Sequence, residues 1–279
     1  MLKISLQQTT DTVVMILPDH FQFNSQTANT NVFQQVSDTK ENQLIKQAAL
    51  NEFANMATLL EKHHINVITL PSRTDVITPD AVFPNNWFSI HCDKNQQCVL
   101  VLYPMLTPNR RDERQVNELK KILSSHQIEI SHVIDLTHFE KNNFALEGTG
   151  SLVLDHIHKI AFAALSPRTD AHVLQQFANK LGFLPVMFHS VDATHQAIYH
   201  TNVMMSIGTH FAVICAETIR DSIERDFVLK QLKQAEKSIM TITLDQMNQM
   251  AGNILELQSR EGKPKIVMSQ SAFAAFSLT

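Results

Sequence analysis

The chain has 279 residues, of which 44% are apolar and 18% are charged, and its formal net charge is −4. A mildly acidic chain with scattered Lys and Arg lacks the basic footprint of a nucleic-acid binder. No window approaches the roughly 20 consecutive apolar residues of a membrane span, and no charged and then apolar leader opens the chain. We therefore expect a soluble, cytoplasmic protein that binds neither nucleic acid nor a membrane.

The cysteine and histidine content argues against stabilisation by disulfides or metals. The three cysteines are Cys92, Cys98 and Cys215. An odd count without a secretory leader speaks against a disulfide framework. The sequence has no C-x-x-C pair, and its 14 histidines do not fall at metal-ligand spacing. We expect no structural metal and no cofactor.

A pattern of two strands, a helix and a further strand recurs along the chain. Apolar periodicity and turn residues mark the boundaries of these elements. The expected strands are 12–17, 65–70, 80–90, 99–102, 128–134, 151–155, 159–165, 184–188, 203–207, 211–216, 238–244, 253–257 and 265–268. The expected helices are 38–63, 111–125, 170–181, 220–235 and 270–276.

A repeat of about 45 to 60 residues is typical of a propeller or array rather than of separate domains. Five units closed into a ring would remove exposed sheet edges. The first unit lacks an opening hairpin partner, and the fifth lacks its last strand. We therefore expect one α/β domain over residues 1–279, a five-bladed α/β propeller of ββαβ repeats. Its fifth unit is incomplete at the C-terminus, so either a segment is missing there or the ring is open.

The unusual polar residues of each unit come just before or at the start of its first strand. They are Asp80, Asn85 and Asn86 in the second unit, Glu147 in the third, His200 and Asn202 in the fourth and Asn253 in the fifth. Equivalent strand starts converge on the axis of a ring, so these side chains would meet in one cavity. A cavity lined by converging polar groups is the default position for a site.

Each cluster alone has a simpler explanation. Asp80 can cap a turn, Asn85 and Asn86 can satisfy their own backbone, and His200 can be a solvated histidine before a strand. The Glu147–Gly150 stretch can be an ordinary turn, because glycines mark turns anywhere. The clusters together indicate a functional site only because they share one position in the repeat.

Several stretches match a known superfamily in order and over nearly the whole chain. They are Pro18–Asn24 with Asn29, Asn31 and Gln34, then Phe83–Ser89, Tyr103–Met105 with Asn109–Arg111, Glu147–Ser151, Tyr199–Val203, and Gln246–Met247 with Ala251–Asn253. The sequence resembles the guanidino-group-modifying superfamily, whose pentein fold includes arginine deiminase, amidinotransferase and dimethylarginine dimethylaminohydrolase. It looks most like the citrulline-utilisation hydrolase branch, also labelled amidinotransferase-like.

The resemblance implies a five-bladed α/β propeller and a covalent reaction. A cysteine thiolate attacks the planar carbon of a guanidino or ureido group, an amine leaves, and water hydrolyses the adduct. By position, His200 corresponds to the general acid and base, Glu147 to the carboxylate of the Glu-Gly motif, and Asp80 to the group that holds substrate nitrogens. The residues expected to line the pocket are Asn24, Asn85, Asn86, Asn202 and Asn253, with Arg110 or Arg111 for the substrate carboxylate.

The sequence departs from the superfamily at the nucleophile. In that superfamily the reactive cysteine lies near the C-terminus, in a Gly-rich loop before the last strand, and this chain has no cysteine after Cys215. Cys215 stands in the apolar run 211–216 and is expected to be a small buried residue. The nucleophile stays unassigned and is expected in a segment beyond Thr279, so the chain as given is expected to be inactive.

We expect a hydrolase of the guanidino or ureido C–N bond of an arginine-like or citrulline-like amino acid. Two alternatives remain open. One is a catalytically dead pentein that binds a ligand or a partner, and the other is an amidinotransferase, in which an amine resolves the adduct. The expected partner is the small-molecule amino acid, and assembly into a homo-oligomer is left open.

Overall fold

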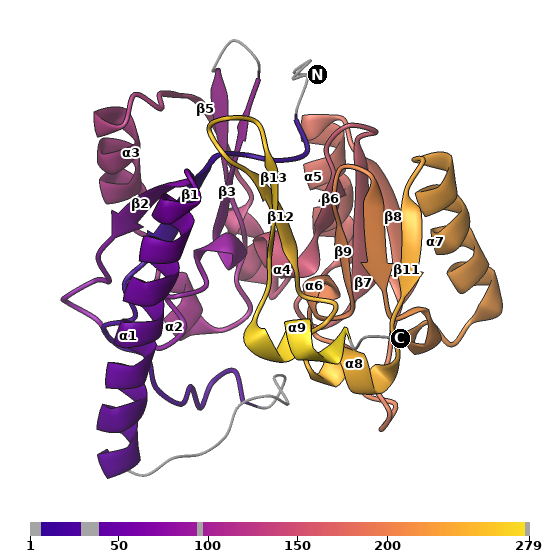
Figure 1. The fold of residues 1–279 in the computed structure, drawn as a ribbon, viewed down its shortest axis with the longest axis horizontal. Helices are drawn as coiled ribbons and strands as arrows, with labels where there is room; N and C mark the ends of the chain where they lie inside the picture. Colours follow the sequence, from indigo (N-terminus) through magenta and orange to yellow (C-terminus); the bar gives the residue numbers. More distant parts are fainter. Residues whose placement is uncertain (1–6, 29–38, 94–96, 277–279) are drawn as a thin grey trace.

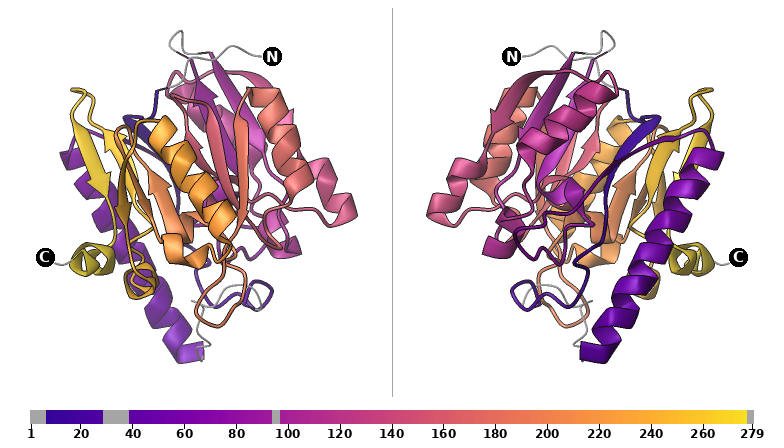
Figure 2. Two further views of the ribbon diagram at one scale, coloured as in Figure 1. Left: turned by 90° about the vertical axis from the view of Figure 1, so that its right-hand side faces the viewer. Right: turned by 90° about the vertical axis from the view of Figure 1, so that its left-hand side faces the viewer.

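The structure is a computed structural model that describes residues 7–28, 39–93 and 97–276. The strands of these residues form five small sheets, three with three strands and two with two (Figure 1). Three helices lie on the periphery of the molecule with sheets between them (Figures 1 and 2), namely α1 (Thr39–Lys62), α3 (Val116–Ser125) and α7 (Ser222–Gln234). Strands and helices alternate along the chain, which confirms the α/β class.

The three-stranded sheets share one pattern. They contain β3 (Phe88–Cys92), β4 (Cys98–Leu102) and β5 (Ile130–Asp135), then β6 (Val153–Asp155), β7 (Ile160–Leu165) and β8 (Leu184–His189), then β9 (Met205–Ile207), β10 (Phe211–Ile214) and β11 (Ser238–Thr241). In each sheet the first strand is antiparallel to the second, and the third is parallel to the second. Helices α3, α5 (Ala171–Leu181) and α7 make the parallel connections. This order of elements is the one that the sequence predicts.

The two-stranded sheets are partial copies of that pattern. β1 (Thr12–Ile16) is parallel to β2 (Asn66–Leu70), and α1 connects them. β12 (Leu255–Gln258) is antiparallel to β13 (Pro264–Val267), which α9 (Gln270–Ala275) follows. Within the described residues, the first sheet has no antiparallel strand and the fifth has no parallel one, as the sequence predicts for the two end units.

Short helical turns stand where the sequence predicts the first residues of strands. The 3-10 turn η1 (Pro84–Asn86) and the helices α4 (Gly148–Ser151) and α6 (Thr201–Met204) directly precede β3, β6 and β9. The predicted strands 80–90, 151–155 and 203–207 therefore begin too early. An apolar run does not distinguish a helical turn from the strand that follows it. The remaining short elements are α2 (Pro108–Arg111), η2 (Thr137–Asn142), η3 (Ala216–Thr218) and α8 (Leu244–Asn248).

Helix α5 illustrates how local signals and packing set the elements. The carboxylate of Asp170 accepts hydrogen bonds from the backbone N–H groups of His172 and Val173, which begins the helix. Gly182 ends it in the left-handed region, with φ of 74°. The buried stripe of the helix is Val173, Leu174, Phe177, Ala178 and Leu181. Each large apolar side chain buried in this way contributes about 1.5 to 3 kcal/mol.

A disulfide joins Cys92 and Cys98, contrary to the expectation from the odd cysteine count. The two residues are direct partners in the antiparallel pair of β3 and β4. Cross-strand neighbours in an antiparallel pair have their Cβ atoms close together, so a hairpin register can bring two thiols within bonding distance. Counting cysteines could not show this, because the pairing follows from local register.

Two kinds of feature are absent from the described part of the chain. No helix there combines the length and the hydropathy of a membrane span. No group of three or more His, Cys, Asp or Glu side chains in residues 7–28, 39–93 and 97–276 is placed to hold a metal ion.

Candidate active site

Three of the short turns pack against one another, and glycines allow it. A Cβ atom on Gly150 of α4 would lie 2.7 Å from Nδ1 of His200 and would overlap the amide of Asn86. A Cβ on Gly148 would overlap the backbone carbonyl of Asn85. The glycines of the Glu147–Gly150 stretch therefore permit close packing between units, and the stretch is more than an ordinary turn.

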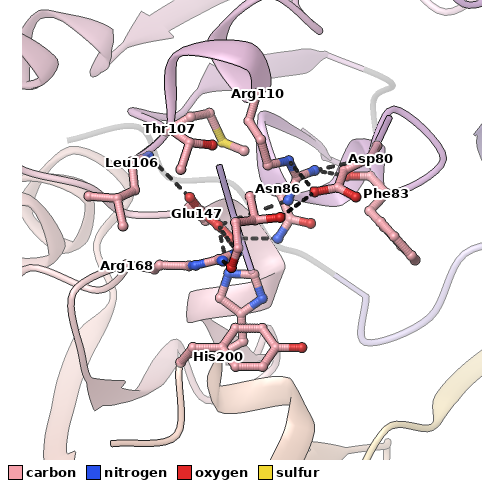
Figure 3. A network of polar contacts seen from close by, with 12 residues as sticks. Asp80, Phe83, Asn86, Leu106, Thr107, Arg110, Glu147, Arg168 and His200 are labelled. Atoms are coloured by element: carbon pink, nitrogen blue, oxygen red, sulfur yellow. Dashed lines mark hydrogen bonds and ion pairs between the residues drawn. The ribbon is translucent and has the colours of Figure 1, made fainter. Parts of the chain in front are cut away.

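An acid–base pair lies at the centre of this contact. Nε2 of His200 donates to Oε2 of Glu147 over 2.8 Å (Figure 3). The carboxylate can only accept here, so Nε2 carries a proton. Nδ1 has no hydrogen-bond partner among the described residues and is the nitrogen left for chemistry. His200 is 5% exposed and Glu147 is fully buried.

Burial shifts the proton affinity of both partners. It lowers the pKa of His200, against the opposing effect of the hydrogen bond and charge of Glu147. Burial alone would raise the pKa of Glu147, but His200, Arg168 and Arg110 outweigh it and hold that pKa at about 2. At neutral pH the pair is a carboxylate beside a neutral imidazole. That imidazole can take up a proton, and the adjacent carboxylate of Glu147 would stabilise the positive charge that results.

Arg168 is the third buried member of the cluster, and the sequence does not single it out. Its Nη1 lies 3.4 Å from Oε2 of Glu147, and its Nη2 donates to the backbone oxygen of Thr27. Its guanidinium stacks over the ring of Tyr199, with 5.0 Å between Cζ and the ring centroid. A lone Arg after a predicted strand is usually solvated, and only its Pro167 neighbour in a polar turn distinguishes it. Here it is 2% exposed.

Asp80 lies on the other side of Arg110 from Glu147 (Figure 3). Its Oδ2 accepts from Nδ2 of Asn24 over 2.7 Å and from Oγ1 of Thr27 over 3.2 Å. Its Oδ1 accepts no hydrogen bond from a described residue. Asp80 is 6% exposed, so one oxygen is committed to the protein and the other is an unoccupied acceptor.

Arg110 connects the two carboxylates from within the protein. Its Nε and Nη2 make a two-point ion pair with Glu113, at 2.8 and 3.0 Å. The guanidinium also lies 4.0 Å from Oδ2 of Asp80 and 4.0 Å from Oε2 of Glu147. Glu113 is a site residue that sequence reasoning missed. Burial raises its pKa to about 7, against the opposing charge of Arg110.

Arg111 does not belong to this cluster, although the sequence offers it as an alternative to Arg110. Its Nε and Nη2 donate to the backbone oxygens of Met105 and Leu106, at 2.8 and 3.0 Å. Those bonds direct it toward Glu140, whose carboxylate is 3.6 Å away.

The five predicted asparagines have three different surroundings. Asn24 and Asn86 join the cluster, since Asn24 bonds Asp80 and Nδ2 of Asn86 donates to the backbone oxygen of Glu147 over 3.4 Å. Asn253 instead donates to the backbone oxygen of Asn202 over 3.0 Å, and neither side chain bonds Asp80, Glu147 or His200. Asn85 contributes its backbone carbonyl, which packs against Gly148.

None of the three cysteines presents a thiolate. Cys92 and Cys98 are bonded to each other. Cys215 is fully buried, and burial raises the pKa of its thiol to about 12. A thiol of that kind stays protonated at neutral pH and is a poor nucleophile.

The fold and the sequence together define the class of protein. The family model for eukaryotic N,N-dimethylarginine dimethylhydrolase matches residues 17–279, so the chain belongs to that family. With it, the chain belongs to the pentein superfamily of guanidino-modifying proteins, as its motifs predict. The match does not select the citrulline-utilisation branch, which stays a prediction. Comparison with curated protein sequences gives no significant match.

Solved structures share the fold at low sequence identity. ArgZ, an arginine dihydrolase from cyanobacteria, superposes with a TM-score of 0.64 at 14% identity over 95% of this chain. The chain spans 37% of the length of that protein. AgrE in complex with ornithine and NAD⁺ has a TM-score of 0.64 at 16% identity, over 88% of this chain and 32% of its own length. The dimethylarginine dimethylaminohydrolase of Pseudomonas aeruginosa in complex with citrulline has a TM-score of 0.55 at 12% identity, over 89% of this chain and 81% of its own.

Proposed function

We propose that this site binds the guanidino group of an arginine-like amino acid and hydrolyses one of its C–N bonds. The observation that carries the proposal is the buried pair of His200 and Glu147 beside Asp80, within one network of ion pairs. A ring of like units explains why these residues meet, so we further infer that the five sheets are the blades of a propeller.

Asp80 is proposed to hold the substrate nitrogens. Its Oδ2 is already bonded to Asn24 and Thr27, which leaves Oδ1 as an acceptor for an N–H group. A guanidinium carries several N–H donors and a positive charge, so it complements a buried carboxylate. Two-point binding of this kind would hold the planar carbon in a fixed orientation near His200.

His200 is proposed as the general acid and base. The neutral Nδ1 of His200 first accepts the proton of the cysteine thiol, the thiolate adds to the planar carbon, and Nδ1 then gives that proton to the departing amine. The neutral Nδ1 then accepts a proton from the water that attacks the thio-adduct, which releases the thiolate and the ureido product. Glu147 stabilises the imidazolium whenever Nδ1 carries a proton, which is before the amine leaves and after water is deprotonated.

The nucleophile of the proposed reaction is a cysteine in a segment that follows Thr279. The chemistry needs a thiolate, and Cys92, Cys98 and Cys215 are bonded or buried. Among the structural relatives, the N-terminal domain of ArgZ has been captured covalently bonded to a reaction intermediate. A cysteine-to-serine variant of the Pseudomonas aeruginosa enzyme is complexed with citrulline.

A non-catalytic ligand-binding protein is the second candidate. The state of the cysteines supports this candidate, because Cys92 and Cys98 are bonded to each other and Cys215 is buried, so none of the three is available to react. It predicts binding of arginine without any covalent step. An amidinotransferase would differ only in the acceptor of the adduct, and added glycine or lysine as acceptor would reveal it by a new guanidino product.

The test is product analysis on the gene's full-length protein. It is incubated with arginine, asymmetric dimethylarginine or citrulline, and the release of amine or ammonia is measured. Loss of release in the His200→Ala variant, with an unchanged melting temperature, supports the hydrolase. Binding by calorimetry without release supports the binding protein. Equal release by the variant and the wild type overturns the role of His200.

A further inference from the structure

A single backbone N–H group sets the orientation of the polar side chains behind Asp80. The N–H of Gln26 donates to Oδ1 of Asn24 over 3.1 Å. A backbone N–H can only donate, so the oxygen of the Asn24 amide must face it. The Asn24 nitrogen then faces Asp80, to whose Oδ2 it donates over 2.7 Å.

The orientation of the Asn109 side chain is fixed by that of Asn24. Nδ2 of Asn109 donates to Oδ1 of Asn24 over 2.6 Å. Because that oxygen can only accept, Asn109 must turn its nitrogen toward it, which leaves Oδ1 of Asn109 to accept from Oγ1 of Thr107 over 3.0 Å. Thr107, Asn109 and Asn24 therefore form a chain of donors that all point toward the carboxylate of Asp80.

Asn109 also holds the segment that carries Asn24. Its backbone N–H donates to Oε1 of Gln26 over 3.1 Å. It stands in α2, next to Arg110, whose guanidinium lies 4.0 Å from Oδ2 of Asp80. One short turn thus contacts Asp80 directly through a charge and indirectly through two amides.

We propose that Asn109 is a positioning residue for Asp80, the carboxylate of the protein that is proposed to hold the substrate nitrogens, and that it acts on Asp80 through Asn24. This inference rests on the proposed function of Asp80 as the group that holds the guanidino nitrogens. Asn109 keeps the Asn24 donor on Oδ2, so that Oδ1 stays turned toward the ligand. It sets the strength with which the site binds cationic N–H donors, and it touches no part of the ligand.

Three substitutions form a graded series. Asn109→Asp keeps the shape but replaces the donor nitrogen by an oxygen that repels Oδ1 of Asn24, so it gives the largest effect. Asn109→Ala removes the contact without a new repulsion. Thr107→Val removes only the outermost hydrogen bond. We expect the Kd for L-arginine to rise about tenfold for Asn109→Asp, less for Asn109→Ala and less than about threefold for Thr107→Val.

The decisive measurement is a double-mutant cycle by calorimetry with L-arginine. If Asn109 acts through Asp80, the effect of Asn109→Ala disappears in an Asp80→Asn background. Asn179→Ala serves as the matched control, because Asn179 lies exposed on α5 and bonds only Gln175. Additive effects of Asn109→Ala and Asp80→Asn overturn the proposal. In a protein that turns over arginine, a positioning role raises KM more than it lowers kcat, because Asp80 holds ground and transition states alike.

The outcomes separate this inference from the proposed function. If Asp80→Asn leaves the affinity for arginine unchanged, Asp80 does not hold the ligand and the proposed function fails. If Asp80→Asn weakens binding and Asn109→Asp does not, only the positioning role fails.

The NMR signals of the Asn24 side chain test the positioning role of Asn109 without any ligand. The side-chain NH₂ of Asn24 gives two cross-peaks in a ¹H–¹⁵N spectrum, and a bond to a carboxylate shifts them. Asn109→Asp should move these peaks in the same direction as Asp80→Asn does, whereas Asn179→Ala should not. Unmoved Asn24 peaks in Asn109→Asp contradict the inference.

Discussion

Nε2 of His200 lies 2.8 Å from Oε2 of Glu147, although 53 residues separate the two along the chain. Each residue stands at the N-terminal end of a four-residue helix that precedes the first strand of its sheet. The backbone N–H of Leu106 donates to the other carboxylate oxygen of Glu147 over 3.1 Å. Three units of the repeat therefore contribute to the environment of one carboxylate.

Glu147→Gln should lower the pKa of His200. Burial already lowers that pKa, the charges of Arg168 and Arg110 lower it as well, and Glu147 is the group that raises it. The imidazole signal of His200 should titrate at lower pH in the variant, as followed by NMR. Glu140→Gln is the control, because Glu140 pairs with Arg111 and Arg114 outside the cluster. A raised or unchanged pKa in Glu147→Gln would contradict the assignment.

Gly150→Ala should displace the imidazole of His200. The added methyl group would lie 2.7 Å from Nδ1 and 2.8 Å from Cε1 of that ring, which is closer than carbon and nitrogen atoms approach. We expect a loss of about 1 to 3 kcal/mol in the free energy of unfolding, together with shifted His200 signals. Gly262→Ala is the contrasting variant. Its φ of 77° is unfavourable, but no atom lies within 4 Å of the new methyl group. It should lower stability by about 1 kcal/mol without moving the His200 signals.

His91 should make the protein sensitive to acid. It is 3% exposed, and its Nε2 contacts Oγ of Ser89 over 2.7 Å. Burial lowers its pKa from 6.5 to about 3, and the neighbouring His156 and Lys159 lower it as well. The folded protein binds fewer protons there than the unfolded chain does, so the stabilisation is complete above pH 6.5 and is lost as the pH falls toward 3.

His91→Gln should remove part of that acid sensitivity. Between pH 6.5 and 4.5, the free energy of unfolding should fall by roughly 2 to 3 kcal/mol less in the variant than in the wild type. The measurement is urea unfolding at a series of pH values, with His63→Gln as the control at an exposed histidine. Parallel pH curves for His91→Gln and the wild type would show that His91 does not contribute.

Glu113→Gln should destabilise the protein far more than removal of a surface charge does. Above the pKa of Glu113, which is about 7, its carboxylate neutralises the buried guanidinium of Arg110. At pH 8 we expect a loss of about 3 kcal/mol, since one partner of a buried ion pair is removed. Glu118→Gln, in the exposed pair with Lys121, should cost less than about 1 kcal/mol. Urea unfolding of both variants tests this, and equal losses would refute the argument.

The repeat explains which parts of the fold could be predicted from the sequence. Alternating apolar runs locate the strands of the three complete sheets, because buried strands are apolar and the turns between them are polar. The predicted starts of β3, β6 and β9 are too early, since the residues before them also fit a helical turn. The odd cysteine count predicts no disulfide framework, whereas the pairing of Cys92 with Cys98 depends on hairpin register.

The cluster was predictable only where its residues share a position in the repeat. Asp80, Glu147 and His200 precede equivalent strands, and the structure joins them in one network. The sequence does not indicate Arg168 and Glu113, because a single charged residue in a polar stretch is usually solvated. Their burial depends on partners from other parts of the chain, which no local pattern contains. The sequence does not distinguish Arg111 from its neighbour Arg110, because only the folded chain brings the backbone oxygens of Met105 and Leu106 to Arg111.

The position of Glu147 has a consequence for how the protein is made. Its hydrogen-bond donors come from residues 106, 168 and 200, so the carboxylate has all of them only when the corresponding units lie side by side. During synthesis the N-terminal portions fold as they emerge. A nascent chain therefore cannot complete the hydrogen bonds of this carboxylate until His200 has left the ribosome.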